Sequence, residues 1–211
     1  MSIDSLIESA VSLRPLLRQN ASAIEESRRL TETVANALND IGAFRLQLPA
    51  EYDGPGADPS GYLRVIEELS RGDGSAGWCA MVGSESSACV HAFLAPNVAR
   101  DMLNVIPRAT VAFTVVGAGK AIETDDGYTV SGRWRFASGC RHSTWLAALC
   151  FVHDGDNPRL RESGAPLTRV VFARTADAQL YDTWKVSGLR GTASDDFEFT
   201  NINVPIGHTF D

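Results

Sequence analysis

Two short segments of the chain bring together side chains that could hold a planar, partly polar cofactor. Residues 132–142 run from a β-type segment into a glycine-containing turn, with an aromatic ring, a hydroxyl and exposed backbone N–H groups. Residues 182–196 place tryptophan, arginine, threonine and serine around two glycines. A flat heteroaromatic ring needs an apolar surface to pack on and polar groups for its edge. The segments therefore indicate a cofactor site, although each alone also fits ordinary strand-end chemistry.

Other motifs with known chemistry are incomplete. Residues 117–121, Gly-Ala-Gly-Lys-Ala, lack the first Gly and the Ser or Thr of a P-loop, and also the third Gly of a dinucleotide fingerprint. We therefore expect a glycine-rich bend between strands there. Cys140 and His142 could share a metal ion with Cys150 and His153 only if the last two faced the same way. Residues three apart on a strand point to opposite faces, which argues against a metal site.

The first 109 residues have a helical pattern. Thr31 is a candidate N-cap for a helix that ends at Gly42, and Asp58, followed by a proline, starts another helix that Gly72 stops. Residues 75–93 are rich in Ala, Ser, Gly and Cys and almost uncharged apart from Glu85. Because a helix with little polar surface is normally buried, we expect this one to lie among close neighbours.

After residue 109 the hydrophobic period changes to two. A strong hairpin signal, Asp126-Gly127, separates two of the candidate strands. We predict an α+β chain with a helical domain at 1–109 and an antiparallel β-sandwich or barrel domain at 110–211. The candidate strands are 110–116, 121–124, 128–136, 145–153, 169–173, 179–186 and 196–204.

The composition excludes several classes of function. The chain has 211 residues, with 19 Lys and Arg against 26 Asp and Glu and a net charge of −7, which disfavours nucleic-acid binding through phosphates. No apolar run approaches the ~20 residues that span a bilayer. The N-terminus has no signal-peptide pattern, so we expect a cytoplasmic protein that binds no membrane. Four cysteines without a C-x-x-C pair are expected to be reduced thiols.

Taken together and in this order, the motifs resemble the acyl-CoA dehydrogenase superfamily. Residues 132–138 fit G-x-W-x-x-x-S, and residues 184–196 fit W-x-x-x-G-x-R-x-[TS]-x-S-x-D. Residues 42–54 are similar to the family pattern G-x-x-x-x-x-x-P-x-x-x-G-G, except that Asp53 replaces the first Gly of the final pair. The resemblance covers essentially the whole chain as the family's helical N-terminal domain and β middle domain.

The flavin-dependent hydroxylase branch fits better than the true dehydrogenases. Dehydrogenases carry a T-E-P-x-x-G-S-D run where this chain has residues 114–121, Thr-Val-Val-Gly-Ala-Gly-Lys-Ala. Residues 72–78 and 136–142 are instead similar to two-component aromatic hydroxylases. The resemblance implies insertion of one oxygen atom into an aromatic or polycyclic substrate, using O2 and reduced FAD or FMN from a separate flavin reductase. The alternatives are dehydrogenation of an acyl-CoA and a truncated, non-catalytic flavoprotein fragment or interaction module.

The resemblance also implies roles for individual residues. Ser138 would bond the flavin near N5 and O4, Phe136 would pack against the isoalloxazine, and Thr114 would reach its pyrimidine edge or the substrate. Two further residues would line the substrate pocket: Trp78, with a core tryptophan as the alternative, and His142, with an exposed turn histidine as the alternative. Matches to the second motif would lie beside the cofactor, namely Trp184, Arg190 and Thr192.

The family builds its active site with a C-terminal four-helix domain. That domain supplies the catalytic base and the tetramer contacts, and we expect it to be absent from a chain that ends at Asp211. No catalytic residue is therefore assigned from the sequence, and a homo-oligomer is expected only where the C-terminal domain is present.

Overall fold

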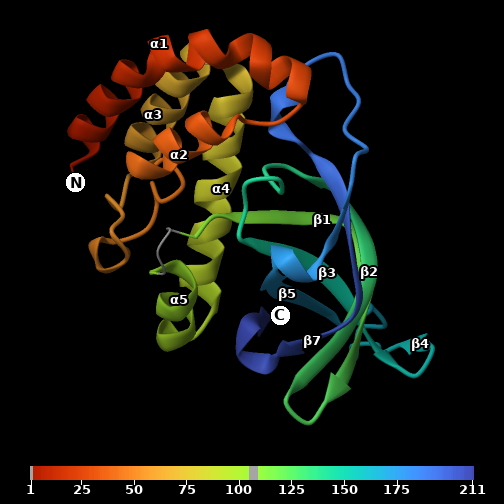
Figure 1. Ribbon diagram of the computed structural model, residues 1–211. Helices are drawn as coiled ribbons and strands as arrows, with labels where there is room; N and C mark the ends of the chain where they lie inside the picture. Colours follow the sequence, from red (N-terminus) through yellow and green to blue (C-terminus); the bar gives the residue numbers. More distant parts are fainter. Residues whose placement is uncertain (1, 105–108) are drawn as a thin grey trace.

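A computed structural model describes residues 2–104 and 109–211 of the chain. Its N-terminal part consists of helices and its C-terminal part is built on a sheet (Figure 1). The α-helices are α1 (Ile3–Ser27), α2 (Glu32–Asp40), α3 (Pro59–Gly72), α4 (Gly74–Phe93) and α5 (Pro96–Leu103), with a short 3-10 helix η1 (Ala50–Tyr52) before α3.

The predicted helix starts are confirmed by side-chain caps. Thr31 accepts a hydrogen bond from the Val34 N–H at the start of α2, and Asp58 accepts one from the Gly61 N–H at the start of α3. Asp73 caps α4 in the same way, one residue before the helix. Each cap satisfies a backbone donor that has no partner within the helix.

Helix α4 lies between the other helices and the sheet (Figure 1). Its small residues are buried as expected, and a Cβ at Gly77 would lie 2.0 Å from the Ser70 hydroxyl oxygen on α3. The glycine therefore allows α3 and α4 to approach closely. The packing of α3 against α4 thus depends on Gly77.

The described strands form one eight-stranded sheet in the order β6-β7-β2-β1-β3-β5-β8, with β4 paired to β3. The sheet is mostly antiparallel, as predicted, but β1 and β3 pair in parallel. The strands are β1 (Val111–Thr124), β2 (Gly127–Ala137), β3 (Trp145–Asp154), β4 (Asn157–Pro158), β5 (Thr168–Arg174), β6 (Gln179–Tyr181), β7 (Asp195–Pro205) and β8 (Thr209–Phe210).

Two local predictions need correction. Residues 117–121 do not form a bend between strands, because β1 runs through them. The pairing of β1 with β3 shifts its register between Thr114 and Gly119, where an irregularity of the β-bulge type accommodates the extra residues. The strand predicted at 179–186 ends at Tyr181, because Thr183 and Trp184 turn their N–H groups to the Asp195 carboxylate and leave the sheet.

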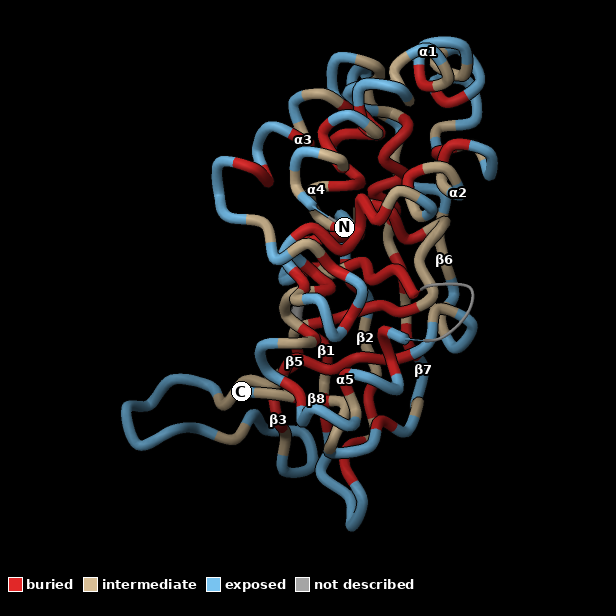
Figure 2. Tube along the Cα trace, turned by 90° about the vertical axis from the view of Figure 1, so that its left-hand side faces the viewer, coloured by how far each residue is buried: buried red, intermediate tan, exposed pale blue. Residues whose placement is uncertain are grey.

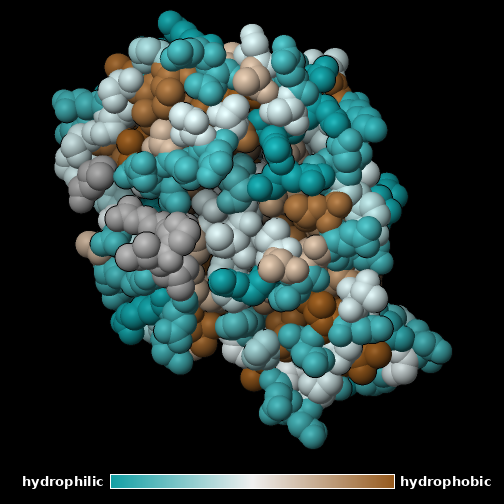
Figure 3. All heavy atoms as spheres, viewed as in Figure 1, coloured by the Kyte–Doolittle hydropathy of each residue, from teal (hydrophilic) through white to brown (hydrophobic). Residues whose placement is uncertain are grey.

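Buried hydrophobic residues in the described part of the chain form three groups, and Figure 2 shows buried positions on the inside of both the helices and the sheet. One fills the helical part, one surrounds Trp134 within the sheet part, and one lies between the two parts. On the face drawn in Figure 3, the surface is mostly hydrophilic with small hydrophobic patches. Within residues 2–104 and 109–211, no helix is long and apolar enough to cross a membrane.

Candidate functional site

Two segments far apart in the sequence meet beside the N-terminal half of α4. They are the turn after β2 and the loop between β6 and β7. The Trp78 indole Nε1 on α4 donates a hydrogen bond of 3.0 Å to the Ser138 hydroxyl in the turn. Ser138 in turn lies 2.7 Å from the Ser194 hydroxyl at the end of the loop. The structure thus joins the two predicted motifs through hydroxyl groups.

The hydroxyl chain continues into the 3-10 helix η3 (Arg190–Thr192). Ser194 Oγ lies 2.7 Å from Thr192 Oγ1, and Thr192 Oγ1 donates to the Leu189 carbonyl at 2.9 Å. Four side chains, from Trp78 to Thr192, are therefore linked in one row. Ser194 was missed by the sequence interpretation, although it lies within the second motif and two residues from Thr192, where a shared face on an extended segment could have indicated it.

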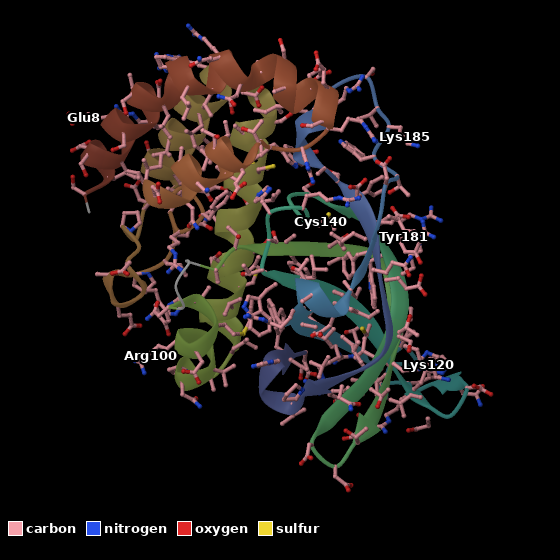
Figure 4. The ribbon with its side chains drawn as sticks, in the orientation of Figure 1. Glu8, Arg100, Lys120, Cys140, Tyr181 and Lys185 are labelled. Carbon is pink, nitrogen blue, oxygen red and sulfur yellow. The ribbon has the colours of Figure 1, made fainter. Side chains whose placement is uncertain are left out.

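Two buried thiols fix the backbone beneath this row. Cys79 on α4 contacts the Thr192 carbonyl at 3.9 Å, and Cys140 donates to the Ala193 carbonyl at 3.3 Å. Burial raises the pKa of both thiols, that of Cys140 to about 12, so they are neutral donors. Figure 4 shows Cys140 between α4 and the sheet, whereas Lys185 lies on the outer side of the loop.

The backbone N–H groups of the turn are not exposed donors, contrary to the sequence interpretation. The Ser138 N–H bonds to the Phe136 carbonyl, the Gly139 N–H to the Thr192 carbonyl, and the Cys140 N–H to the Ala137 carbonyl. The turn closes on itself and on η3, and this uses the donors that a free turn would offer to a ligand.

Phe136 presents its ring to the surface through an unusual backbone conformation. Its φ is 59°, in the left-handed region, at a point where the pairing of β2 with β7 shifts register between Trp134 and Ala137. A bulge of this kind re-aims a side chain, and left-handed conformations of non-glycine residues concentrate at functional sites. The ring is 53% exposed and meets Trp184 edge to face, with 6.0 Å between the ring centroids.

Asp195 holds the loop that carries Trp184, and the sequence interpretation also missed it. One carboxylate oxygen accepts the N–H groups of Thr183 and Trp184 at 3.0 and 2.9 Å, and the other accepts Arg141 Nε at 2.7 Å. The carboxylate is nearly buried, so these charge-assisted bonds fix the loop against the turn after β2.

Two predicted cofactor residues have their polar groups engaged elsewhere. The Thr114 hydroxyl donates to the Arg135 carbonyl at 2.6 Å and accepts from the Val116 N–H. Arg190 lies 3.6 Å from the Glu25 carboxylate on α1, on the side of η3 that faces the helices. The structure therefore does not bring Thr114 and Arg190 into the row of hydroxyls.

His142 and Trp78, predicted together for a substrate pocket, lie in different surroundings. His142 lines a cavity of about 590 Å³ together with Phe44, Thr110 and residues of α1 and α2, and Trp78 is not among its lining residues. The His142 ring packs 5.5 Å from that of Phe44, and burial lowers its pKa to about 4. His142 is therefore a partly buried, neutral imidazole rather than an exposed turn histidine. Trp78, 40% exposed, is likewise not a core tryptophan.

The row of hydroxyls is bordered by exposed apolar side chains from α4 and from the two segments beside it. The exposed apolar side chains are those of Trp78, Phe136 and Leu189, of which Leu189 is 43% exposed. The Leu189 carbonyl also accepts a hydrogen bond from the Trp184 indole N–H. Exposed rings beside oriented hydroxyls suit a flat heteroaromatic group such as the isoalloxazine of a flavin. Among residues 2–104 and 109–211, no group of three His, Cys, Asp or Glu side chains could hold a metal ion.

Comparison with known proteins decides the family. Residues 13–101 match the family described as acyl-CoA dehydrogenase, N-terminal domain. The chain is 30% identical over 198 residues to the flavin-dependent monooxygenase oxygenase subunit HsaA of Rhodococcus jostii, aligning 92% of this chain with 49% of that protein. Over residues 13–101 the chain belongs to the acyl-CoA dehydrogenase family, as its N-terminal domain.

Further superfamily members support the same branch and the same fold. A pigment production hydroxylase of Rhodococcus erythropolis is 32% identical over 194 residues, 88% of this chain and 47% of the relative. The structure of XiaF from Streptomyces, in complex with FADH2 and glycerol, superposes with a TM-score of 0.88 over 99% of this chain and 51% of XiaF, at 21% identity. The chain thus spans about half the length of the superfamily relatives that it matches.

Proposed function

We propose that this chain provides the flavin-binding surface of a flavin-dependent monooxygenase. The enzyme would use reduced flavin and O2 to insert one oxygen atom into an aromatic or polycyclic small molecule. The observation that carries the proposal is the convergence of Trp78, Ser138 and Ser194 in one row, next to the exposed ring of Phe136, which contacts the partly buried ring of Trp184. Relatives named as flavin-dependent monooxygenase and as hydroxylase add to its support.

In this proposal each residue has a definite task toward the flavin. Phe136 and Trp184 would pack against the isoalloxazine and exclude water from it, and Ser138 would meet its polar edge near N5 and O4. Asp195 would keep Trp184 in place through the loop backbone. The flavin, when bound in its reduced form, supplies the electrons for the activation of O2.

The proposal extends to partners that a two-component enzyme requires. A separate flavin reductase would deliver the reduced flavin, and FAD and FMN both remain candidates. The cytoplasmic location expected from the N-terminal sequence belongs to the same proposal, and so does the homo-oligomer expected where the family's C-terminal domain is present. The acyl-CoA dehydrogenase alternative predicts instead that a panel of acyl-CoAs reduces the bound flavin, and this result would reverse the choice between the two branches.

The test compares two phenylalanines of similar exposure. Phe136→Ala removes a ring from the proposed flavin surface, whereas Phe93→Ala removes a ring that is 57% exposed at the far end of α4. Titration of each variant with FMN, followed by flavin fluorescence, should show about two- to tenfold weaker binding for Phe136→Ala, the size of an aromatic contact. Phe93→Ala should bind FMN as the unaltered chain does. Equal affinities in all three proteins would contradict the proposal.

A further inference from the structure

The direction of every hydrogen bond in the hydroxyl row can be derived from its two ends. The Trp78 indole Nε1 can only donate, so Ser138 Oγ is the acceptor at one end. The Leu189 carbonyl can only accept, and besides the Trp184 indole N–H and the Thr192 N–H it accepts the single proton of Thr192 Oγ1, over the shortest of the three contacts, 2.9 Å. Thr192 must then accept from Ser194, and Ser194 must accept from Ser138, over contacts of 2.7 Å each.

This order leaves Ser138 without a free proton. Its hydroxyl accepts from Trp78 and donates to Ser194, so only one oxygen lone pair is left for a bound group. The backbone N–H groups of residues 138, 139 and 140 are bonded within the turn and to η3. The Thr114 hydroxyl proton is likewise given to the Arg135 carbonyl. Toward a ligand beside Ser138, these groups together offer an acceptor and no donor.

We infer that Ser194 and Thr192 make Ser138 an obligate hydrogen-bond acceptor, so that the site selects reduced over oxidised flavin. The inference rests on the proposed function, because it takes Ser138 to lie at N5 of the isoalloxazine. In oxidised flavin N5 has a lone pair and no hydrogen, and two facing acceptors leave both without a partner. In reduced flavin N5 carries a hydrogen, which the free lone pair of Ser138 accepts. Ser194 and Thr192 are thus positioning residues that act through Ser138.

The selection has a direct consequence for an enzyme that receives its flavin from another protein. Oxidised flavin would compete with reduced flavin for the same surface if the two bound equally well. An acceptor-only Ser138 penalises the oxidised form, since leaving a polar group unpaired on binding costs more than forming the bond gains. The row of hydroxyls therefore favours both capture of the reduced form and release of the oxidised form.

Ser194→Ala distinguishes the effect of Ser194 on the Ser138 proton from a general loss of structure at the site. The variant frees the Ser138 proton, which can then be donated to N5 of oxidised flavin. Oxidised FMN should consequently bind about two- to tenfold more tightly than to the unaltered chain, the range for one neutral hydrogen bond. Reduced FMN should bind no more tightly than before. A gain in affinity for one redox state is not expected from a loosened structure.

The experiment measures the dissociation constants of oxidised FMN and of anaerobically reduced FMN by ultrafiltration. The proteins are the unaltered chain, Ser194→Ala, Thr192→Val and Ser143→Ala. Thr192→Val removes the far end of the row, so it should also lower the preference for reduced over oxidised FMN. It replaces Ser194→Ala in the comparison if that variant does not fold. Ser143 donates to the Gly139 carbonyl in the same turn but stands outside the row, so Ser143→Ala should leave the ratio unchanged.

The outcomes distinguish the two proposals. A fall in the preference for reduced FMN in Ser194→Ala and Thr192→Val, but not in Ser143→Ala, supports the inference. Binding of FMN with the same ratio in all four proteins overturns the inference and leaves the flavin surface standing. Absence of binding of either form to the unaltered chain overturns both.

Discussion

At the scale of single residues, His142 makes a defined prediction about pH. Its ring is packed against Phe44, its Nδ1 is buried with no hydrogen-bond partner among residues 2–104 and 109–211, and burial lowers its pKa from 6.5 to about 4. Between these values the unfolded chain binds a proton that the folded chain does not. The free energy of unfolding should therefore fall as the pH drops from 6.5 to 4, and His142 should add nothing further below that.

His142→Gln should flatten this part of the stability curve, measured by urea unfolding at a series of pH values. His208, whose pKa is also lowered by burial, is half-buried, so His208→Gln should flatten it by a smaller amount. The carboxyls of Asp154 and Asp182 have pKa values below their usual 3.8, and their contribution is lost only at lower pH. Parallel curves for the unaltered chain and His142→Gln would mean that the imidazole charges freely in the folded state.

At the scale of elements, Gly191 lets the loop before β7 dock against two helices. A Cβ at this position would lie 2.1 Å from Ile24 Cγ2 on α1 and 2.9 Å from Ser75 Cβ on α4. Gly191→Ala should therefore destabilise the chain by about 1–3 kcal/mol through overpacking, as measured by urea unfolding. It should also lower the preference for reduced over oxidised FMN, as Ser194→Ala does, because Thr192 and Ser194 would move away from Ser138. Gly188→Ala, in the same loop but with no described atom within 4 Å of the added Cβ, should change stability by no more than about 0.5 kcal/mol.

The elements also show which features the sequence could predict. Caps such as Thr31 and Asp58 are local signals, and the helices start where those signals lie. The parallel pairing of β1 with β3 joins strands that are not consecutive, and no local pattern specifies it. The site divides in the same way. Ser138 and Thr192 stand in recognisable motifs, but the bond from Trp78 to Ser138 spans 60 positions and depends on how α4 packs.

At the scale of the whole molecule, the buried cluster between the two parts determines how the chain unfolds. This cluster takes Val90 and Leu94 from the helical part and Val111, Trp145 and Phe172 from the sheet part. The division of the chain at residue 109 into two domains is a proposal from sequence. Because the two parts share a core, we expect a single cooperative transition across that division rather than two independent ones.

Unfolding in urea should accordingly give coincident curves from far-ultraviolet circular dichroism, which reports the helices, and from tryptophan fluorescence, which includes Trp134 and Trp145 in the sheet. Leu94→Ala should lower both midpoints together, by the equivalent of about 2–5 kcal/mol, because the cavity opens in the shared core. Leu38→Ala, in the core of the helical part alone, should also move both curves if the transition is shared. A Leu38→Ala variant that shifts the helical signal and leaves the fluorescence transition in place would instead mean that the two parts are independently stable. The flavin surface, built from both parts, would then depend on their docking and could be lost while each part stayed folded.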